Sequence, residues 1–234
     1  MRKFSIALSA VGVLVMLGIT TAAQASPRPQ IQPDATPACG ANCFDLYSLA
    51  FGRHQIQSAN VPGDEGVGGK VGQTINLQYA TDSSPNEDFT IGYVGTVALL
   101  CGEDQLSPYI CNTYGTSSTY GGNFPVYESN WSPYGNESDL CAGVARPAAA
   151  GENVTLQECG VSSATFWVAD ESHAHIGYTP FLNGSDNTFT HPLVLTVVSG
   201  PKIGRRLRLE RLNLLTGGYI ANEQMWAVAF GIEL

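Results

Sequence analysis

Three segments of the chain share one pattern, Gly-x-x-Φ-x-Leu, in which Φ is an aliphatic residue. The pattern occurs at residues 72–77, 151–156 and 204–209. After each glycine, apolar residues alternate with polar ones, as in a β-strand with one buried face. An aromatic residue that could fill a shared core follows each segment, at Phe89, Trp167 and Trp226. The pattern therefore predicts an internal threefold repeat built from strands.

The rest of the sequence also favours β structure. From Phe44 onwards, short runs of β-branched and aromatic residues alternate with Gly, Asn, Ser and Pro. The 26 glycines and 13 prolines are too many for a helix bundle. Only residues 145–150 resemble a helix, and Pro147 interrupts them. We expect an all-β protein.

The repeats are unevenly spaced, and much of the extra length falls at about residues 100–136. This stretch is rich in Tyr, Ser and Gly, a composition typical of recognition loops. We predict that it is a long surface insertion in the first repeat. Its aromatic residues are Tyr109, Tyr114, Tyr120, Tyr127, Trp131 and Tyr134.

The amino-terminal residues indicate export. Residues 1–25 combine a basic start, an apolar core and a small-x-small cleavage site, which predicts a signal peptide. Residues 26–37 hold four prolines and predict a flexible leader, so the domain spans 38–234. No apolar run of membrane-spanning length follows, so we expect a secreted, extracellular protein without membrane insertion. Removing Arg2 and Lys3 with the signal takes the net charge from −9 to −11, which argues against a nucleic-acid partner.

The cysteines fit an oxidising compartment. All six lie after the predicted signal peptide, and an even number of this kind predicts three disulfides. Spacing favours the pairs Cys39–Cys43, Cys101–Cys111 and Cys141–Cys159. No Cys-x-x-Cys motif occurs, and His173 and His175 have no assignable third ligand. We therefore predict neither a metal site nor a cofactor.

Residues 140–168 resemble one repeat of the ricin-type β-trefoil family. That repeat has an early Cys, a Gly before a Φ-x-Leu strand, a second Cys and then Gln-x-Trp, and the segment has Cys141, Gly151 and Cys159 in this order. The last repeat keeps Gln-x-Trp intact at Gln224 and Trp226. Residues 43–47 are also similar to the opening of secreted bacterial proteins of this size. The resemblance covers about residues 40–232 and implies a β-trefoil-like domain with three pseudo-repeats.

The resemblance also implies where a sugar would bind. In this family an Asp near the first Cys bonds sugar hydroxyls, an aromatic ring stacks on the sugar, and the Gln of Gln-x-Trp holds the Asp. No repeat keeps this whole set, so we expect a degenerate site. The last repeat is the best candidate, with Asn222, Gln224 and Trp226 as ligand-binding residues, although Thr196 stands near the Asp position. The tryptophans of this motif are mostly core residues in the family, which we expect of Trp226 as well.

Three functions remain open at this point. The first is a lectin-like binding module for a polysaccharide or glycoconjugate. The second is an extracellular protease inhibitor, because other β-trefoils inhibit proteases through an exposed loop, here within residues 100–136. The third is an enzyme, for which we find no Gly-x-Ser-x-Gly, His-Glu-x-x-His or Ser-x-x-Lys motif. We therefore predict a binding protein rather than an enzyme.

Overall fold

The computed structural model describes residues 43–52, 55–59, 69–80, 84–115, 122–145, 148–198 and 205–230. The predicted signal peptide and leader lie outside them. The described residues form twelve strands in three successive groups of four. The first group is β1 (Phe44–Ser48), β2 (Gln55–Ser58), β3 (Asn76–Tyr79) and β4 (Phe89–Thr96). The second is β5 (Pro125–Trp131), β6 (Leu140–Gly143), β7 (Thr155–Glu158) and β8 (Trp167–Ala169). The third is β9 (Phe181–Asn183), β10 (Leu193–Val197), β11 (Arg205–Arg211) and β12 (Trp226–Phe230).

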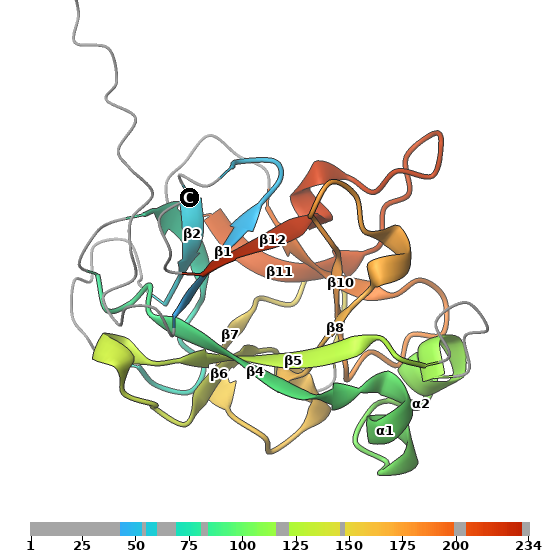
Figure 1. Ribbon diagram of the computed structural model, residues 1–234, viewed down its shortest axis with the longest axis horizontal. Helices are drawn as coiled ribbons and strands as arrows, with labels where there is room; N and C mark the ends of the chain where they lie inside the picture. The colour runs from blue at the N-terminus through green and yellow to red at the C-terminus, as the bar shows by residue number, and fades with distance from the viewer. Residues whose placement is uncertain are drawn as a thin grey trace, which may run out of the picture. The chain divides into compact units, whose positions relative to one another are not determined.

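The three groups repeat one pairing scheme. The first strand of a group pairs antiparallel with the second strand of its own group and with the fourth strand of the group before it. β1 and β5 also pair with the fourth strand of their own group, while Thr179, just before β9, bridges to Trp226. The second and third strands of each group form a hairpin. In Figure 1, β4 and β5 run side by side where the first group meets the second.

The three Gly-x-x-Φ-x-Leu segments meet one another through their backbones. The amide of Ile75 donates to the carbonyl of Val154 at 3.0 Å, and the amide of Val154 donates to Leu207 at 2.8 Å. The amide of Leu207 closes the ring by donating to Ile75 at 3.2 Å. The Φ and Leu side chains of all three segments are buried in one core cluster. The predicted threefold repeat is therefore confirmed, and its axis passes through these segments.

Two of the motif glycines are required by backbone conformation. Gly72 and Gly151 have φ of 85° and 86°, a left-handed conformation that favours glycine. A Cβ at either position would meet no atom within 4 Å, so space is not the constraint. At these two positions the glycine thus sets the turn that leads into the repeat strand.

The expected aromatic core residues occupy equivalent places. Phe89, Trp167 and Trp226 are all buried in the same cluster as the repeat strands. The indole N–H of Trp167 donates to the carbonyl of Ala142 at 2.9 Å, and that of Trp226 donates to Leu195 at 2.8 Å. Each indole therefore buries its ring without leaving its one donor unsatisfied.

The stretch of about residues 100–136 differs from the expected surface excursion. It begins with α1 (Val97–Gly102), α2 (Pro108–Ile110) and a π-helical turn (Cys111–Gly115), which Figure 1 shows at one end of β4 and β5. Leu100, Tyr109, Ile110 and Tyr114 are buried in a second core cluster. The strand β5 then takes residues 125–131 into the barrel. The insertion is thus shorter than expected and is packed, because its apolar side chains find a surface of the barrel to cover.

Most of the aromatic residues expected at the surface are also buried. Trp131 is buried in the main core and Tyr127 is half-buried, whereas Tyr134 is exposed. Tyr120 lies outside the described residues. The recognition surface predicted for this stretch is therefore corrected to a single exposed ring among the residues described.

Two of the expected disulfides are present. Cys101–Cys111 closes the helical insertion, and Cys141–Cys159 joins the two strands of the β6–β7 hairpin at their outer end. Cys43 is also disulfide-bonded, and its expected partner Cys39 lies outside the described residues. No helix in the described part of the chain has the length and apolar character needed to cross a membrane.

Candidate functional site

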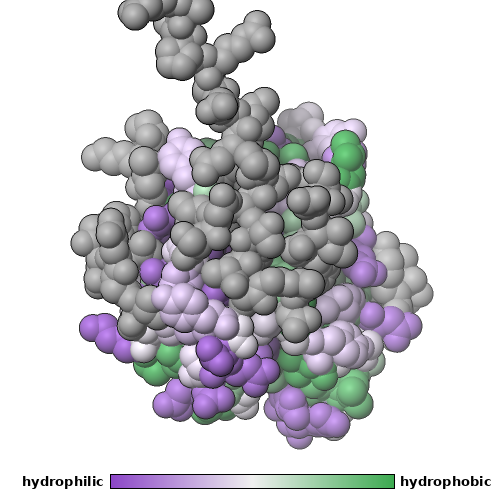
Figure 2. Space-filling view, turned by 60° about the vertical axis from the view of Figure 1, so that its left-hand side comes forward, coloured by the Kyte–Doolittle hydropathy of each residue, from purple (hydrophilic) through white to green (hydrophobic). Residues whose placement is uncertain are grey.

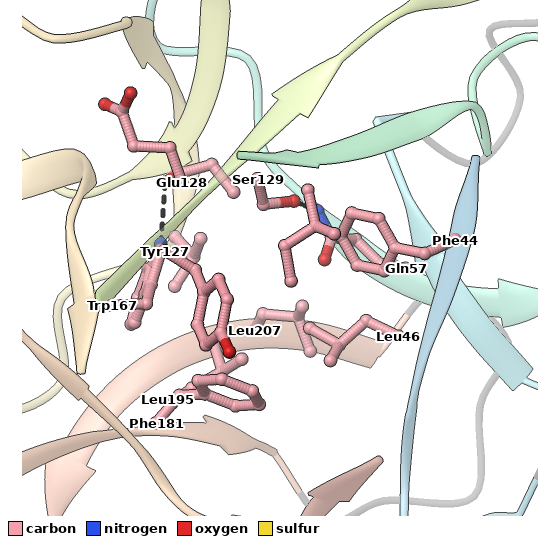
Figure 3. Close-up of a pocket in the computed structure, with 13 residues that line it drawn as sticks. Phe44, Leu46, Gln57, Tyr127, Glu128, Ser129, Trp167, Phe181, Leu195 and Leu207 are labelled. Atoms are coloured by element: carbon pink, nitrogen blue, oxygen red, sulfur yellow. Dashed lines mark hydrogen bonds between the residues drawn. The ribbon is translucent and has the colours of Figure 1, made fainter. Parts of the chain in front are cut away.

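The interior of the barrel holds a cavity, which Figure 3 shows in close-up. Apolar side chains from all three repeats line it, among them Leu46, Trp167 and Leu207. Its volume of about 30 Å³ has room for one or two water molecules and none for a sugar ring. Burial raises the pKa of the Tyr127 hydroxyl at its edge, with smaller contributions from Glu171 and Tyr93. The barrel interior is therefore a core and not a binding site.

A larger cleft of about 430 Å³ opens between two connections. One connection links β8 to β9, and the other links β11 to β12. We call it the Tyr219 cleft. Its principal lining residues are His173, His175, Ile176, Leu215, Tyr219 and Asn222.

A buried carboxylate organises the start of the first connection. Asp170 is fully buried and caps a short 3₁₀ helix, η5 (Glu171–His173). One oxygen accepts the Ser172 amide at 3.1 Å, and the other lies 2.7 Å from Nδ1 of His173. The His173 ring is therefore held in place at the wall of the cleft.

A tight hairpin follows. His175 and Tyr178 exchange backbone hydrogen bonds of 2.8 and 3.0 Å around the two corner residues Ile176 and Gly177. Both corner residues have positive φ, 51° and 78°. Ile176 is 80% exposed, so an aliphatic side chain stands at the rim of the cleft.

The second connection supplies an aromatic ring. The Leu215 amide donates to the Tyr219 carbonyl at 2.7 Å across a turn that contains Gly217 and Gly218, with φ of 92° and 81°. Tyr219 is 60% exposed, and its ring lies edge-on to the His175 imidazole with 5.7 Å between centroids. The two connections therefore meet at this aromatic contact.

Asn222 completes the polar side of the cleft. It begins the 3₁₀ helix η6 (Asn222–Gln224) and is exposed. Its carbonyl accepts the Ser48 hydroxyl at 3.2 Å, which anchors the backbone. No hydrogen bond engages its side-chain amide among the residues that the structure describes. That amide is free to meet a ligand.

The other two expected ligand residues have structural roles. Gln224 is buried, and its amide nitrogen donates to the Thr196 hydroxyl at 3.1 Å and to the Arg211 carbonyl at 2.8 Å. Its oxygen accepts the Asn213 amide at 2.7 Å, so its hydrogen-bonding groups are used internally. Trp226 has no exposed surface. Of the three expected ligand residues Asn222, Gln224 and Trp226, only Asn222 has an accessible side chain.

The sequence did not point to Tyr219 or Ile176 as site residues. Gly217 and Gly218 indicate a turn before Tyr219, but no local sequence pattern predicts that this turn meets His175. The cleft also brings together the His-x-His pair and Asn222, which sequence reasoning kept apart. Among the described residues, no group of three His, Cys, Asp or Glu side chains is placed to hold a metal ion.

The chemistry of the cleft is uncharged apart from its histidines. None of its described lining residues is Lys, Arg, Asp or Glu. Apolar side chains stand beside an amide, a serine hydroxyl and two imidazoles. Such a surface suits a neutral ligand that presents both hydroxyl groups and C–H faces.

Comparison with known proteins supports the fold. No family model matches the sequence, and no curated protein matches it. A designed threefold symmetric protein, ThreeFoil, is similar in structure with a TM-score of 0.52 and 10% identity, over 80% of this chain and 98% of that one. A mosquitocidal holotoxin is similar with a TM-score of 0.50 and 12% identity, over 80% of this chain and 17% of the toxin.

The pairing scheme and these similarities together define the class of the protein. It has a β-trefoil fold, with three four-stranded repeats and a helical insertion after the first. More particularly, it is a disulfide-stabilised β-trefoil whose accessible cleft fits a binding module.

Proposed function

We propose that the protein is a secreted, lectin-like carbohydrate-binding module of the ricin type, and that the Tyr219 cleft binds a polysaccharide or glycoconjugate. The observation that carries the proposal is an exposed tyrosine ring beside an exposed asparagine amide that no described residue bonds. The predicted signal peptide and the disulfides support secretion.

The two groups complement each other on a sugar. A tyrosine ring packs against the C–H face of a pyranose, and an amide can donate to one hydroxyl and accept from another. The anchored backbone of Asn222 and the contact of the Tyr219 ring with His175 restrain the two groups before a ligand arrives, which lowers the entropy cost of binding. The cleft volume lies in the range of small-ligand sites.

The alternative of a protease inhibitor has less support. It depended on an exposed loop within residues 100–136. The described parts of that stretch are residues 100–115, which are mostly helical, closed by a disulfide and partly buried, and residues 122–136, which include β5. An inhibitory loop needs an extended and exposed backbone, which favours the cleft as the functional site.

The test is a titration of neutral and acidic monosaccharides against the wild type, Asn222→Ala and Tyr219→Ala. We expect neutral sugars to bind with a dissociation constant of roughly 1 mM, equivalent to about −4 kcal/mol. Each substitution should weaken binding about fivefold to tenfold, the effect of one lost hydrogen bond or ring contact. Tyr79→Ala removes another exposed tyrosine and serves as the control that leaves affinity unchanged. Equal affinity in the wild type and both cleft variants would contradict the proposal.

A further inference from the structure

The Tyr219 cleft carries more exposed aliphatic surface than a plain hexose can use. Ile176 is 80% exposed and Leu215 is 48% exposed, and both line the cleft beside the tyrosine ring. Among the coloured residues of Figure 2, hydrophobic ones form separate patches between hydrophilic ones. Clustered apolar side chains at the rim of a cleft mark a contact for an apolar group.

The position of Ile176 in its hairpin strengthens this point. In two-residue turns with positive φ, Asn, Asp and Gly are the residues that fit, because a branched side chain crowds the backbone there. The chain instead places a β-branched residue at φ 51° and exposes it to water. A strained residue at a site is a reason to look for a role in that site. The role that an aliphatic side chain can take is contact with an apolar group of the ligand.

A hexose has no such group apart from the C–H face that one aromatic ring covers. An acetamido group adds a methyl, which suits Ile176 and Leu215, and an amide N–H and C=O, which suit the free amide of Asn222. The described lining offers a carboxylate two histidines and no Lys or Arg. The cleft therefore matches a neutral sugar with an acetamido substituent better than a uronic acid.

We infer that the Tyr219 cleft selects N-acetylated amino sugars over the corresponding hexoses, and that Ile176 determines this selectivity. The inference rests on the proposed function, because it names the class of sugar bound at the same site. A pocket contact with one methyl-sized group changes affinity by about tenfold or more.

The experiment compares N-acetylglucosamine and N-acetylgalactosamine with glucose, galactose and fucose by calorimetry or ligand-observed NMR. We expect the wild type to bind at least one acetylated sugar about tenfold more tightly than its parent hexose. Ile176→Asn should reduce that preference to about twofold, mainly by weakening the binding of the acetylated sugar. Val161→Asn removes an exposed aliphatic side chain outside the cleft and should change neither value.

The failures are distinguishable. Hexose binding with no acetyl preference in the wild type overturns the inference and leaves the proposed function standing. A preference that survives in Ile176→Asn overturns the role of that residue. Fucose bound as tightly as the acetylated sugars overturns the acetamido class, because a ring methyl would then suffice. Absence of binding to every sugar overturns the proposed function and the inference together.

Discussion

At the scale of single residues, Ile176 combines two features that are unfavourable for the stability of the folded protein. Its left-handed backbone costs roughly 1–2 kcal/mol in a residue with a branched side chain. Its side chain gains almost nothing from burial, since it is 80% exposed. Replacement by a residue that suits the turn should therefore stabilise the protein.

We expect Ile176→Asn to raise the free energy of unfolding by about 1 kcal/mol, because asparagine tolerates positive φ. Urea unfolding of the two proteins measures the change. Val161→Asn, at an exposed position without this backbone conformation, should stay within about 0.5 kcal/mol of the wild type. A less stable Ile176→Asn protein would contradict the strain at this corner.

At the scale of elements, one polar interaction links the helical insertion to the connection that forms the cleft. The Tyr114 hydroxyl of the insertion interacts electrostatically with the carboxylate of Asp170, the same group that caps η5 and holds His173. Burial raises the pKa of Tyr114 well above its usual range, and the charge of Asp170 raises it further. The insertion thus supports a wall of the cleft through Asp170.

This arrangement predicts a loss of stability at alkaline pH. Above about pH 10 this tyrosine ionises in the unfolded chain, while the buried Tyr114 of the folded protein keeps its proton. Ionisation therefore stabilises the unfolded state alone, and the free energy of unfolding falls. Tyr114→Phe should be less stable at pH 7 by about 0.5–1.5 kcal/mol, the usual net value of one buried polar interaction.

The same variant should lose stability less steeply between about pH 9 and pH 11, because one ionising group is gone. Urea unfolding at several pH values measures both the difference in stability at pH 7 and the slope of stability with pH. Tyr134→Phe changes an exposed tyrosine and is the matched control. Equal slopes for Tyr114→Phe and the wild type would show that this hydroxyl is not protected by the fold.

At the scale of the whole molecule, stability depends on the meeting of three repeats at one axis. Ile75, Val154 and Leu207 are each bonded to the next and are all buried in one cluster. No single repeat can satisfy these backbone groups by itself. We therefore expect the described domain to unfold as one unit.

Ile75→Ala and Leu207→Ala should each lower the free energy of unfolding by about 2–5 kcal/mol, the usual cost of truncating a large buried aliphatic residue. Far-ultraviolet circular dichroism and tryptophan fluorescence should report coincident transitions in both variants. Separate transitions, with one repeat surviving the loss of another, would contradict this cooperativity.

The strands of the repeat could be predicted because their signals are local. A glycine followed by alternating residues specifies both the turn and the buried face at 72–77 and 151–156, and the structure follows that pattern. Residues 97–115 could not be predicted in the same way. Their Tyr, Ser and Gly content is typical of a loop, and only packing against the barrel buries Tyr109 and Tyr114.

The candidate site was predictable only at Asn222. The sequence named Asn222 as a ligand candidate and put Thr196 near the position that the Gln of the resembling repeat holds, and Gln224 does donate to Thr196. The contact between Tyr219 and His175 joins two connections that are far apart in sequence. No sequence pattern in either connection predicts that the two meet. Sites built from separate loops depend on tertiary structure for their composition.

The ring of hydrogen bonds at the axis also bears on when the protein can fold. Its third member, Leu207, is synthesised long after Ile75, and closing such distant contacts is slow because loop entropy is lost before the contacts form. A nascent chain that lacks the third repeat leaves the apolar side chains of the first two without their shared core. Folding is therefore delayed until synthesis is nearly finished, and during that interval the chain is a natural client for chaperones.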